Sequence, residues 1–207
     1  MVIDHPIFLE SIRFIRSHLG ANDLNYLEKK VLERLVHTSG DFSVQNLVNF
    51  SEGACEKGLQ ALKNGAPILT DTDMAAAAIK SMAENTTRNK VFPARMWFRK
   101  NNHTKLTKTA YGLCEGWKEL SVKNFGTKSP IVVIGSSPTA LTYLIDFLED
   151  GKDLPSLIIG MPVGFIGVEK SKDKLISTGL PRIVLNSTRG GAAMAAAAVN
   201  ALLRETI

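Results

Sequence analysis

A unit that recurs four times along the sequence constrains the fold most strongly. In each unit a short apolar run leads through a polar or glycine-rich turn into a helical segment. The apolar runs cover residues 67–69, 131–134, 157–159 and 183–185. They are too uniformly apolar for strands with one face in water, and strands that alternate with helices favour a parallel sheet covered on both faces. The sequence therefore predicts a three-layer α/β/α fold with a mainly parallel, doubly wound sheet.

The first third of the chain is predicted to be helical. Apolar residues recur at helical spacing over 7–19 and 24–36, and Ser51 is a suitable N-cap for a third helix. No linker or change of composition divides the sequence, which predicts a single domain over residues 1–207 with a helical N-terminal region. The segment 86–126, in which two tryptophans stand among basic residues, gives no clear prediction.

The composition excludes disordered and fibrous proteins. A chain with 44% hydrophobic and 22% charged residues is typical of an ordinary globular protein. No apolar run reaches the roughly 18 residues that span a bilayer, and the N-terminal residues do not form a signal peptide, so we expect a cytoplasmic protein without a membrane partner. Cys55 and Cys114 form no CxxC motif and are expected to be buried thiols.

Positive charge is concentrated in one segment. Residues 86–128 contain ten Lys or Arg and two acidic residues, whereas the rest of the chain contains fifteen basic and eighteen acidic residues. This asymmetry suggests a face that binds an anion, although an ordinary solvated surface explains it equally well. Because no aromatic RNA-binding motif is present, nucleic acid is not an expected partner.

The candidate ligand site follows from the predicted sheet. Ligands of open parallel sheets bind at the carboxyl ends of the strands, where helix N-termini favour anions and glycines let the backbone approach closely. No loop at this edge contains a dinucleotide, P-loop or GxSxG motif. Asp71 and Asp73 could bind a hard cation, but carboxylates at the start of a helix are more often caps, so we expect no metal. The predicted site loops are 70–73, 135–139, 160–165 and 186–191.

His37 is the candidate acid. It lies at the predicted end of the second helix and is followed by the polar residues 38–41. Free carbonyl groups at a helix end stabilise an imidazolium by about 0.3–2 kcal/mol, which would keep a proton donor available near neutral pH. From position alone, a histidine that only ends its helix is the simpler interpretation.

Five segments together resemble the precorrin-8X methylmutase family. The resemblance implies an enzyme that moves a methyl group from C11 to C12 of an anionic corrin-pathway tetrapyrrole, giving hydrogenobyrinate or its cobalt counterpart. It also implies a homodimer and no redox cofactor. The alanine-rich C-terminal helix is a candidate for the subunit interface or for a surface that takes a flat ligand, although close packing of the helix on the sheet explains its composition equally well. The segments are RLVHTSGDF (34–42), GAPILTDTDMAAAAI (65–79), IGSSPTAL (134–141), GMPVGFIGVEKSK (160–172) and RGGAAMAAAAVNALL (189–203).

The resemblance also implies roles for particular residues. His37 matches the family's acid, whose proton makes the conjugated macrocycle electron-poor and eases a [1,5] methyl shift. Together with the sheet-edge rule, the resemblance predicts a set of residues that bind the substrate. They are Ser11, Asp41, Thr70, Asp71, Lys108, Gly135, Ser136, Ser137, Thr139, Gly160, Pro162, Gly164, Phe165, Arg189, Gly190 and Gly191.

Some positions depart from the family pattern. Lys108 stands where the family usually has an arginine, so the charge is kept but the bidentate fork is lost. Ser136, Ser137 and Ala192 also differ from the usual residues of their loops. A relative that binds a corrinoid or another polyanion without converting it therefore remains an alternative to the enzyme.

Overall fold

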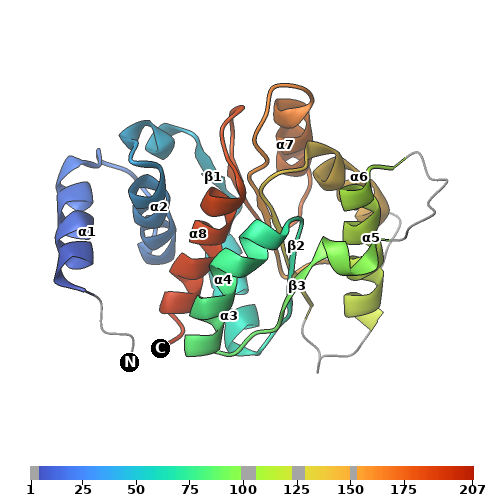
Figure 1. Cartoon of the computed structure of the whole chain (residues 1–207). Helices are drawn as coiled ribbons and strands as arrows, with labels where there is room; N and C mark the ends of the chain where they lie inside the picture. Colours follow the sequence, from blue (N-terminus) through green and yellow to red (C-terminus); the bar gives the residue numbers. More distant parts are fainter. Residues whose placement is uncertain (1–4, 99–105, 123–128, 150–152) are drawn as a thin grey trace.

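The computed structural model describes residues 5–98, 106–122, 129–149 and 153–207, which form a six-stranded sheet between layers of helices (Figure 1). The strands are β1 (Val48–Phe50), β2 (Ile68–Thr70), β3 (Val91–Pro93), β4 (Ile131–Ile134), β5 (Leu157–Gly160) and β6 (Arg182–Leu185). The helices described are α1 (Pro6–His18), α2 (Tyr26–Ser39), α3 (Ala54–Lys63), α4 (Asp73–Asn85), α5 (Lys108–Val122), α6 (Pro138–Glu149), α7 (Val168–Ser177) and α8 (Ala192–Arg204), with 3₁₀ turns η1 (Phe42–Asn46) and η2 (Ala94–Trp97).

The sheet is mainly parallel, as predicted. Its order is β1-β6-β5-β4-β2-β3, and only the edge strand β1 runs antiparallel to its neighbour. From β2 the chain winds outward to β3 and then returns to β4 on the other side, so the winding reverses between β2 and β4. That reversal makes the sheet doubly wound. The four predicted apolar runs became β2, β4, β5 and β6, whose residues are almost all buried.

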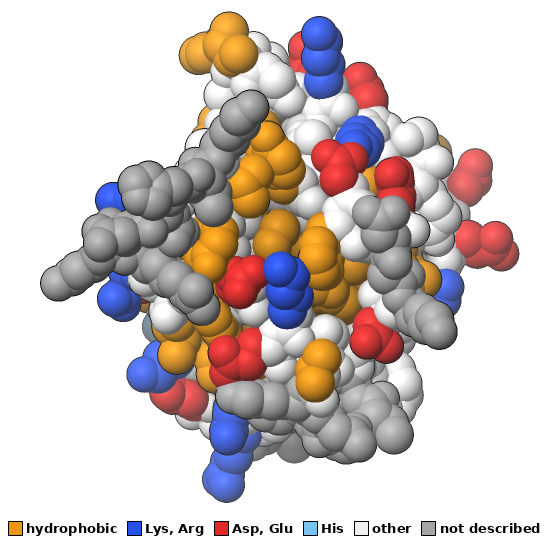
Figure 2. All heavy atoms as spheres, turned by 90° about the vertical axis from the view of Figure 1, so that its right-hand side faces the viewer, with side chains coloured by type: hydrophobic (Ala, Val, Ile, Leu, Met, Phe, Trp, Pro, Cys, Tyr) orange, Lys and Arg blue, Asp and Glu red, His pale blue; other side chains and the backbone are white. Residues whose placement is uncertain are grey.

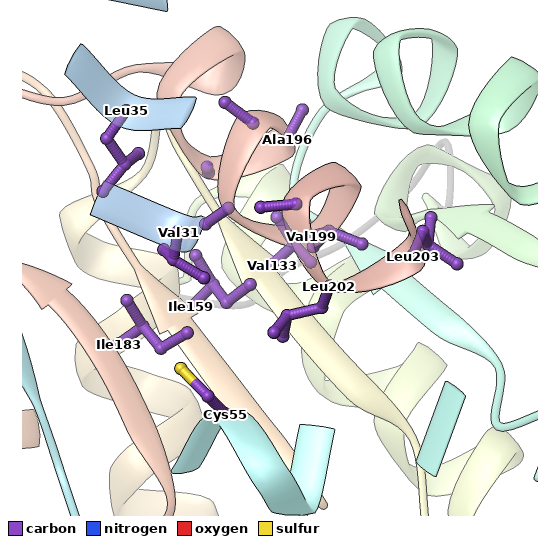
Figure 3. Close-up of a cluster of buried hydrophobic side chains, with 14 of the residues drawn as sticks. Val31, Leu35, Cys55, Val133, Ile159, Ile183, Ala196, Val199, Leu202 and Leu203 are labelled. Atoms are coloured by element: carbon purple, nitrogen blue, oxygen red, sulfur yellow. The ribbon is translucent and has the colours of Figure 1, made fainter. Parts of the chain in front are cut away.

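Alternate strand residues face opposite helical layers. Val133 and Ile159 belong to a core that also contains residues of α2, α3, α4 and α8 (Figure 3). Val132 and Ile158 face the second core, beneath α5, α6 and α7. Because successive side chains of a strand point to opposite faces, a sheet covered on both sides needs apolar residues at every position.

The N-terminal region is helical, with one boundary predicted incorrectly. Asn25 and Glu28 form a capping box that starts α2, and Gly40 ends it in the left-handed conformation. The prediction that Ser51 caps the third helix is wrong, because α3 begins at Ala54 after Gly53. Ser51 instead accepts a hydrogen bond from the backbone N–H of Arg182 (2.9 Å), which extends the pairing of β1 with β6.

The alanine-rich helix α8 lies inside the molecule. Its small side chains pack against α2, α3 and α4 and against the central strands β4 and β5 (Figure 1). Residues Met194–Leu203 are all buried. The expectation that this helix is a subunit interface is therefore wrong, since the chain's own elements already cover it.

Candidate functional site

The end of α2 lies at the carboxyl edge of the sheet. Val48 pairs with Leu185, the last residue of β6, and the backbone N–H of Asn186 donates to the carbonyl of Leu47 (2.7 Å). The segment between α2 and β1 therefore meets the loop that follows β6. This geometry places His37 at the same edge as the loops that follow the other parallel strands.

His37 lies in the last turn of α2 and contacts α1. Its ring is edge-on to the ring of Phe8, with centroids 5.2 Å apart, and the guanidinium of Arg34, one turn earlier, lies 5.1 Å from the same phenyl centroid. Partial burial, together with the nearby charge of Arg34, lowers the pKa of His37 below 6.5. This direction is opposite to the stabilised imidazolium that the helix terminus predicts for the protein without ligand.

A cavity of about 530 Å³ opens beside His37. It lies between α1, the end of α2 and η1, and it brings the predicted residues Ser11 and His37 together. The Ser11 hydroxyl donates to the carbonyl of Ile7 (3.0 Å). The lining is mostly apolar, which suits a flat hydrophobic ligand better than a compact charged one. The lining residues are Ile7, Glu10, Ser11, Phe14, Ile15, Val36, His37, Gly40 and Phe42.

Arg189 joins the loop after β6 to the end of α2. Its guanidinium forms an ion pair with Asp41 and donates to the Ser43 hydroxyl (2.7 Å). The bond from Arg189, with further bonds from Ser43, lowers the pKa of Asp41 to about 2. These two predicted site residues thus bind each other, and a smaller cavity of about 200 Å³ lies beside them, lined in part by Thr38 and Gly190.

The glycines of the predicted site allow its loops to pack together. A Cβ on Gly190, whose φ is +156°, would lie 2.1 Å from the carbonyl oxygen of Met161, and Gly191 donates its N–H to that same oxygen (2.9 Å). A Cβ on Gly135 would lie 2.6 Å from the Cα of Ala192. The loops after β4, β5 and β6 therefore touch one another, which gives Gly135 and Gly190 a packing reason as well as the ligand reason that the sequence suggested. A Cβ on Gly160 would contact Leu175 of α7 (2.7 Å).

Asp71 holds the loop after β4. Its Oδ2 accepts hydrogen bonds from the backbone N–H groups of Ser136 (2.6 Å) and Ser137 (3.0 Å), and the residue is 3% exposed. Burial raises the pKa of Asp71, while these backbone bonds act in the opposite direction. Asp71 thus bridges β2 and β4, the two strands between which the winding reverses and where open sheets commonly bind ligands.

The expected capping role of the two carboxylates is wrong. Thr72 caps α4 by accepting from the N–H of Ala75 (3.2 Å). Asp73 pairs with Arg95 at the surface (2.7 Å). Thr70 is buried and donates to the carbonyl of Thr72 (2.9 Å). Within the part of the chain that the structure describes, no group of three or more His, Cys, Asp or Glu side chains could hold a metal ion.

The N-termini of α5 and α6 meet near Lys108. Thr107 accepts from the N–H of Ala110 (3.2 Å) and Ser137 accepts from that of Ala140 (3.1 Å), so each hydroxyl caps its helix. The hydroxyl oxygens of Thr107 and Thr139 lie 3.2 Å apart, which brings the exposed Lys108 beside the loop after β4. β5 and β6 lie between the N-termini of α5 and α6 and the end of α2. The predicted site residues of these loops are therefore spread along the edge of the sheet.

The loop between β5 and α7 exposes an apolar tip. Pro162 is buried, and Gly164 donates its N–H to the carbonyl of Thr188 (3.0 Å). Beyond them Phe165 is 90% exposed and Ile166 is 89% exposed. The structure therefore places the predicted site residue Phe165 on the solvent-exposed surface.

The basic segment does not form a continuous positive face among the described residues. Arg95 and Lys118 pair with acidic neighbours. Figure 2 views the side of the molecule that carries α5, where Lys and Arg side chains alternate with acidic and hydrophobic ones. Five basic residues of the segment fall within 99–105 and 123–128, outside the described residues.

Sequence reasoning missed three residues of this region. Phe8 and Arg34 flank His37, and the spacing of Arg34, one helical turn before His37, was a usable signal. Lys172 was missed because its helix, VEKSKDKLIS, reads as an exposed charged surface. The two cysteines are buried thiols as predicted, and burial raises the pKa of Cys114 to about 11.

Comparisons with known proteins agree on one family. The model of the precorrin-8X methylmutase family matches residues 6–205. The chain is 36% identical to precorrin-8X methylmutase of Pseudomonas aeruginosa, over 96% of this chain and 94% of the relative. It is 31% identical to cobalt-precorrin-8 methylmutase of a Synechocystis strain, over 97% and 95%. A crystal structure of precorrin-8X methyl mutase from Thermus thermophilus superposes with a TM-score of 0.84 at 31% identity, covering 97% of this chain and 95% of that one. No helix in the described ranges is long and apolar enough to span a membrane.

Proposed function

The chain belongs to the precorrin-8X methylmutase family, and we propose that it moves a methyl group from C11 to C12 of a precorrin-8-type tetrapyrrole with His37 as the proton donor. As a member of this family, it is an isomerase of cobalamin biosynthesis. The observation that carries the residue assignment is the cavity between α1 and the end of α2, where Ser11 of α1 and His37 of α2 both line a largely apolar space.

The chemistry of this edge matches a large anionic macrocycle. The apolar cavity suits the conjugated ring, and the peripheral carboxylates need cationic or N–H partners. Arg189, Lys108 and the N-termini of α5 and α6 supply such groups along the same edge. Thr70, Asp71 and the packed glycines support the loops, which makes them positioning residues rather than ligand contacts in this proposal.

His37 is proposed to gain its proton as the substrate binds. In the empty site, burial and Arg34 favour the neutral imidazole. A polycarboxylate bound nearby favours the imidazolium, because an opposite charge within about 4–6 Å raises a histidine pKa. The proton then passes from His37 to the macrocycle, the methyl group migrates, and the product returns one proton. The reaction is an isomerisation without net proton consumption, so His37 is regenerated in each cycle.

The test is incubation with precorrin-8X or its cobalt form, followed by visible absorption. Conversion to a corrin chromophore supports the isomerase. The alternative, a binding protein, is favoured by Lys108 in place of the family's arginine. It predicts tight binding of the substrate with the precorrin chromophore unchanged, and that result would overturn catalysis by this chain.

We further propose that the protein is a homodimer in the cytoplasm. Phe165 and Ile166 expose an apolar tip that a second copy could cover. Sedimentation should give about twice 22.5 kDa. A mass of a single chain at micromolar concentration would contradict the dimer.

A further inference from the structure

We propose that Lys172 is a positioning residue of the site: its buried ammonium group fixes the loop that carries Arg189 and, through Arg189, the end of α2 beside His37. The structural part of this inference is independent of the reaction. Its kinetic consequence rests on the proposed function.

Lys172 is unusual for its helix. Glu169, Lys170 and Asp173 of α7 are exposed, whereas Lys172 has no exposed surface. Its Nζ donates to the backbone carbonyls of Ser187 (2.6 Å) and Arg189 (2.7 Å). Within the described ranges no carboxylate lies at ion-pair distance from it, so these two carbonyls are what its charge binds. Burying an ammonium group is costly unless hydrogen bonds compensate, so both bonds are needed for this arrangement.

The two carbonyls define the turn after β6. They belong to residues two positions apart, and both must point at one nitrogen, which restrains the backbone on either side of Thr188. The same turn is held by the N–H of Arg189 on the Ser187 hydroxyl (3.0 Å) and by the N–H of Gly164 on the carbonyl of Thr188 (3.0 Å). Lys172 of α7 thus holds, through two hydrogen bonds, the loop that positions the backbone of Arg189.

Arg189 carries this restraint to α2. Its guanidinium holds Asp41 and Ser43, and Asp41 is four residues beyond His37. Asp41 is also fixed locally, since its N–H donates to the Ser39 hydroxyl (3.3 Å) and its Oδ1 accepts from the N–H of Ser43 (2.8 Å). A continuous set of hydrogen bonds therefore connects α7, the loop after β6 and the end of α2.

The structural test is hydrogen–deuterium exchange of the unliganded protein. Lys172→Met keeps the length and apolar stem but leaves both carbonyls without their donor. We expect exchange about tenfold faster in segment 187–191 and also faster in segment 38–43, since one hydrogen bond contributes about a tenfold factor. Lys170→Met, two positions away on the exposed side of α7, should change neither segment. Unchanged exchange in 38–43 would overturn the proposal.

The kinetic test is a double-mutant cycle with Arg189→Ala. If Lys172 acts through Arg189, each single variant raises KM for the tetrapyrrole, and Lys172→Met has little further effect once Arg189 is absent. Because both variants retain His37 as the proton donor, kcat should change less than KM. A lysine with only a structural role gives independent effects that multiply in the double variant, which would contradict the proposal.

Lys172→Gln covers the case in which Lys172→Met does not fold. Its amide nitrogen has two N–H donors but is uncharged and shorter, so faster exchange in both segments is still expected and unchanged exchange in 38–43 still overturns the inference. If the wild-type protein fails to isomerise precorrin-8, the exchange results remain decisive for Lys172. The two proposals can therefore fail separately.

Discussion

The imidazole of His37 lies edge-on to the phenyl ring of Phe8, with an interplanar angle of 86°. Phe8 belongs to α1 and His37 to α2, so the outermost helix shields one side of the candidate acid from water. This contact places the helical N-terminal region beside the candidate acid, whose pKa is lowered by partial burial and by the charge of Arg34.

Removing the phenyl ring should return the His37 pKa toward 6.5. Phe8→Ala opens that side of the imidazole to water, which relieves the desolvation that disfavours the charged form. An NMR titration of the imidazole protons measures the shift directly. Leu9→Ala is a matched control on α1, since Leu9 does not line the cavity beside His37. A pKa that does not rise in Phe8→Ala would show that Phe8 does not shield His37.

The two kinetic pH profiles should differ. The profile of kcat/KM reports the free enzyme, so it should fall as pH rises through a His37 pKa below 6.5. The profile of kcat reports the enzyme–substrate complex, in which the bound carboxylates raise that pKa, so its fall should occur at higher pH. Coincident falls in both profiles would contradict the proposal that substrate binding protonates His37.

Asp71 should matter more for stability than Asp73. Asp71→Ala leaves two backbone N–H groups without their acceptor in a buried place, which should lower the free energy of unfolding by about 2–4 kcal/mol. Asp73→Ala removes a solvent-exposed pair and should have little effect. Urea denaturation of both variants checks this, and equal losses would refute the bridging role of Asp71.

Lys172 should make the free energy of unfolding depend on pH in the alkaline range. Burial lowers its pKa to about 8 from an ordinary 10.5, so between these values the unfolded chain binds more protons than the folded one. The free energy of unfolding should therefore rise with pH in this window, relative to Lys172→Met, by at most about 1.4 kcal/mol per pH unit. Parallel denaturation curves for the two proteins from pH 8 to 10 would contradict the shift.

The strands that the sequence predicted are those whose side chains are buried on both faces. β2, β4, β5 and β6 are central, so most of their residues are apolar and the runs were visible. β1 and β3 were missed because each is a three-residue edge strand of intermediate exposure, too short to show a period. Ser51 was misassigned because a serine that bonds to a neighbouring strand has the same local sequence as an N-cap.

The sequence located the loops of the candidate site but not the interactions of their side chains. The sheet-edge rule selected the loop of Arg189, and the helix end with the resemblance selected His37. Arg189 nevertheless binds Asp41, 148 residues away in the chain, and no local pattern reveals such a pair. Burial and the charge of Arg34 lower the pKa of His37, which the position at a helix terminus does not reveal. Gly190 was interpreted as a glycine that lets a ligand approach the backbone. Its actual steric limit comes from Met161 in a different loop, which the local sequence does not show.

The turnover of precorrin-8 by His37→Ala decides whether His37 is the proton donor. Loss of the proton donor should lower kcat about 10²–10⁴-fold, while spectroscopic titration with the corrin product should show nearly unchanged binding, since the carboxylate partners lie elsewhere. His37→Gln should not restore the rate, because an amide donates a hydrogen bond but does not act as an acid at neutral pH. Turnover of His37→Ala at close to the wild-type rate would contradict the account and assign His37 only to the end of its helix.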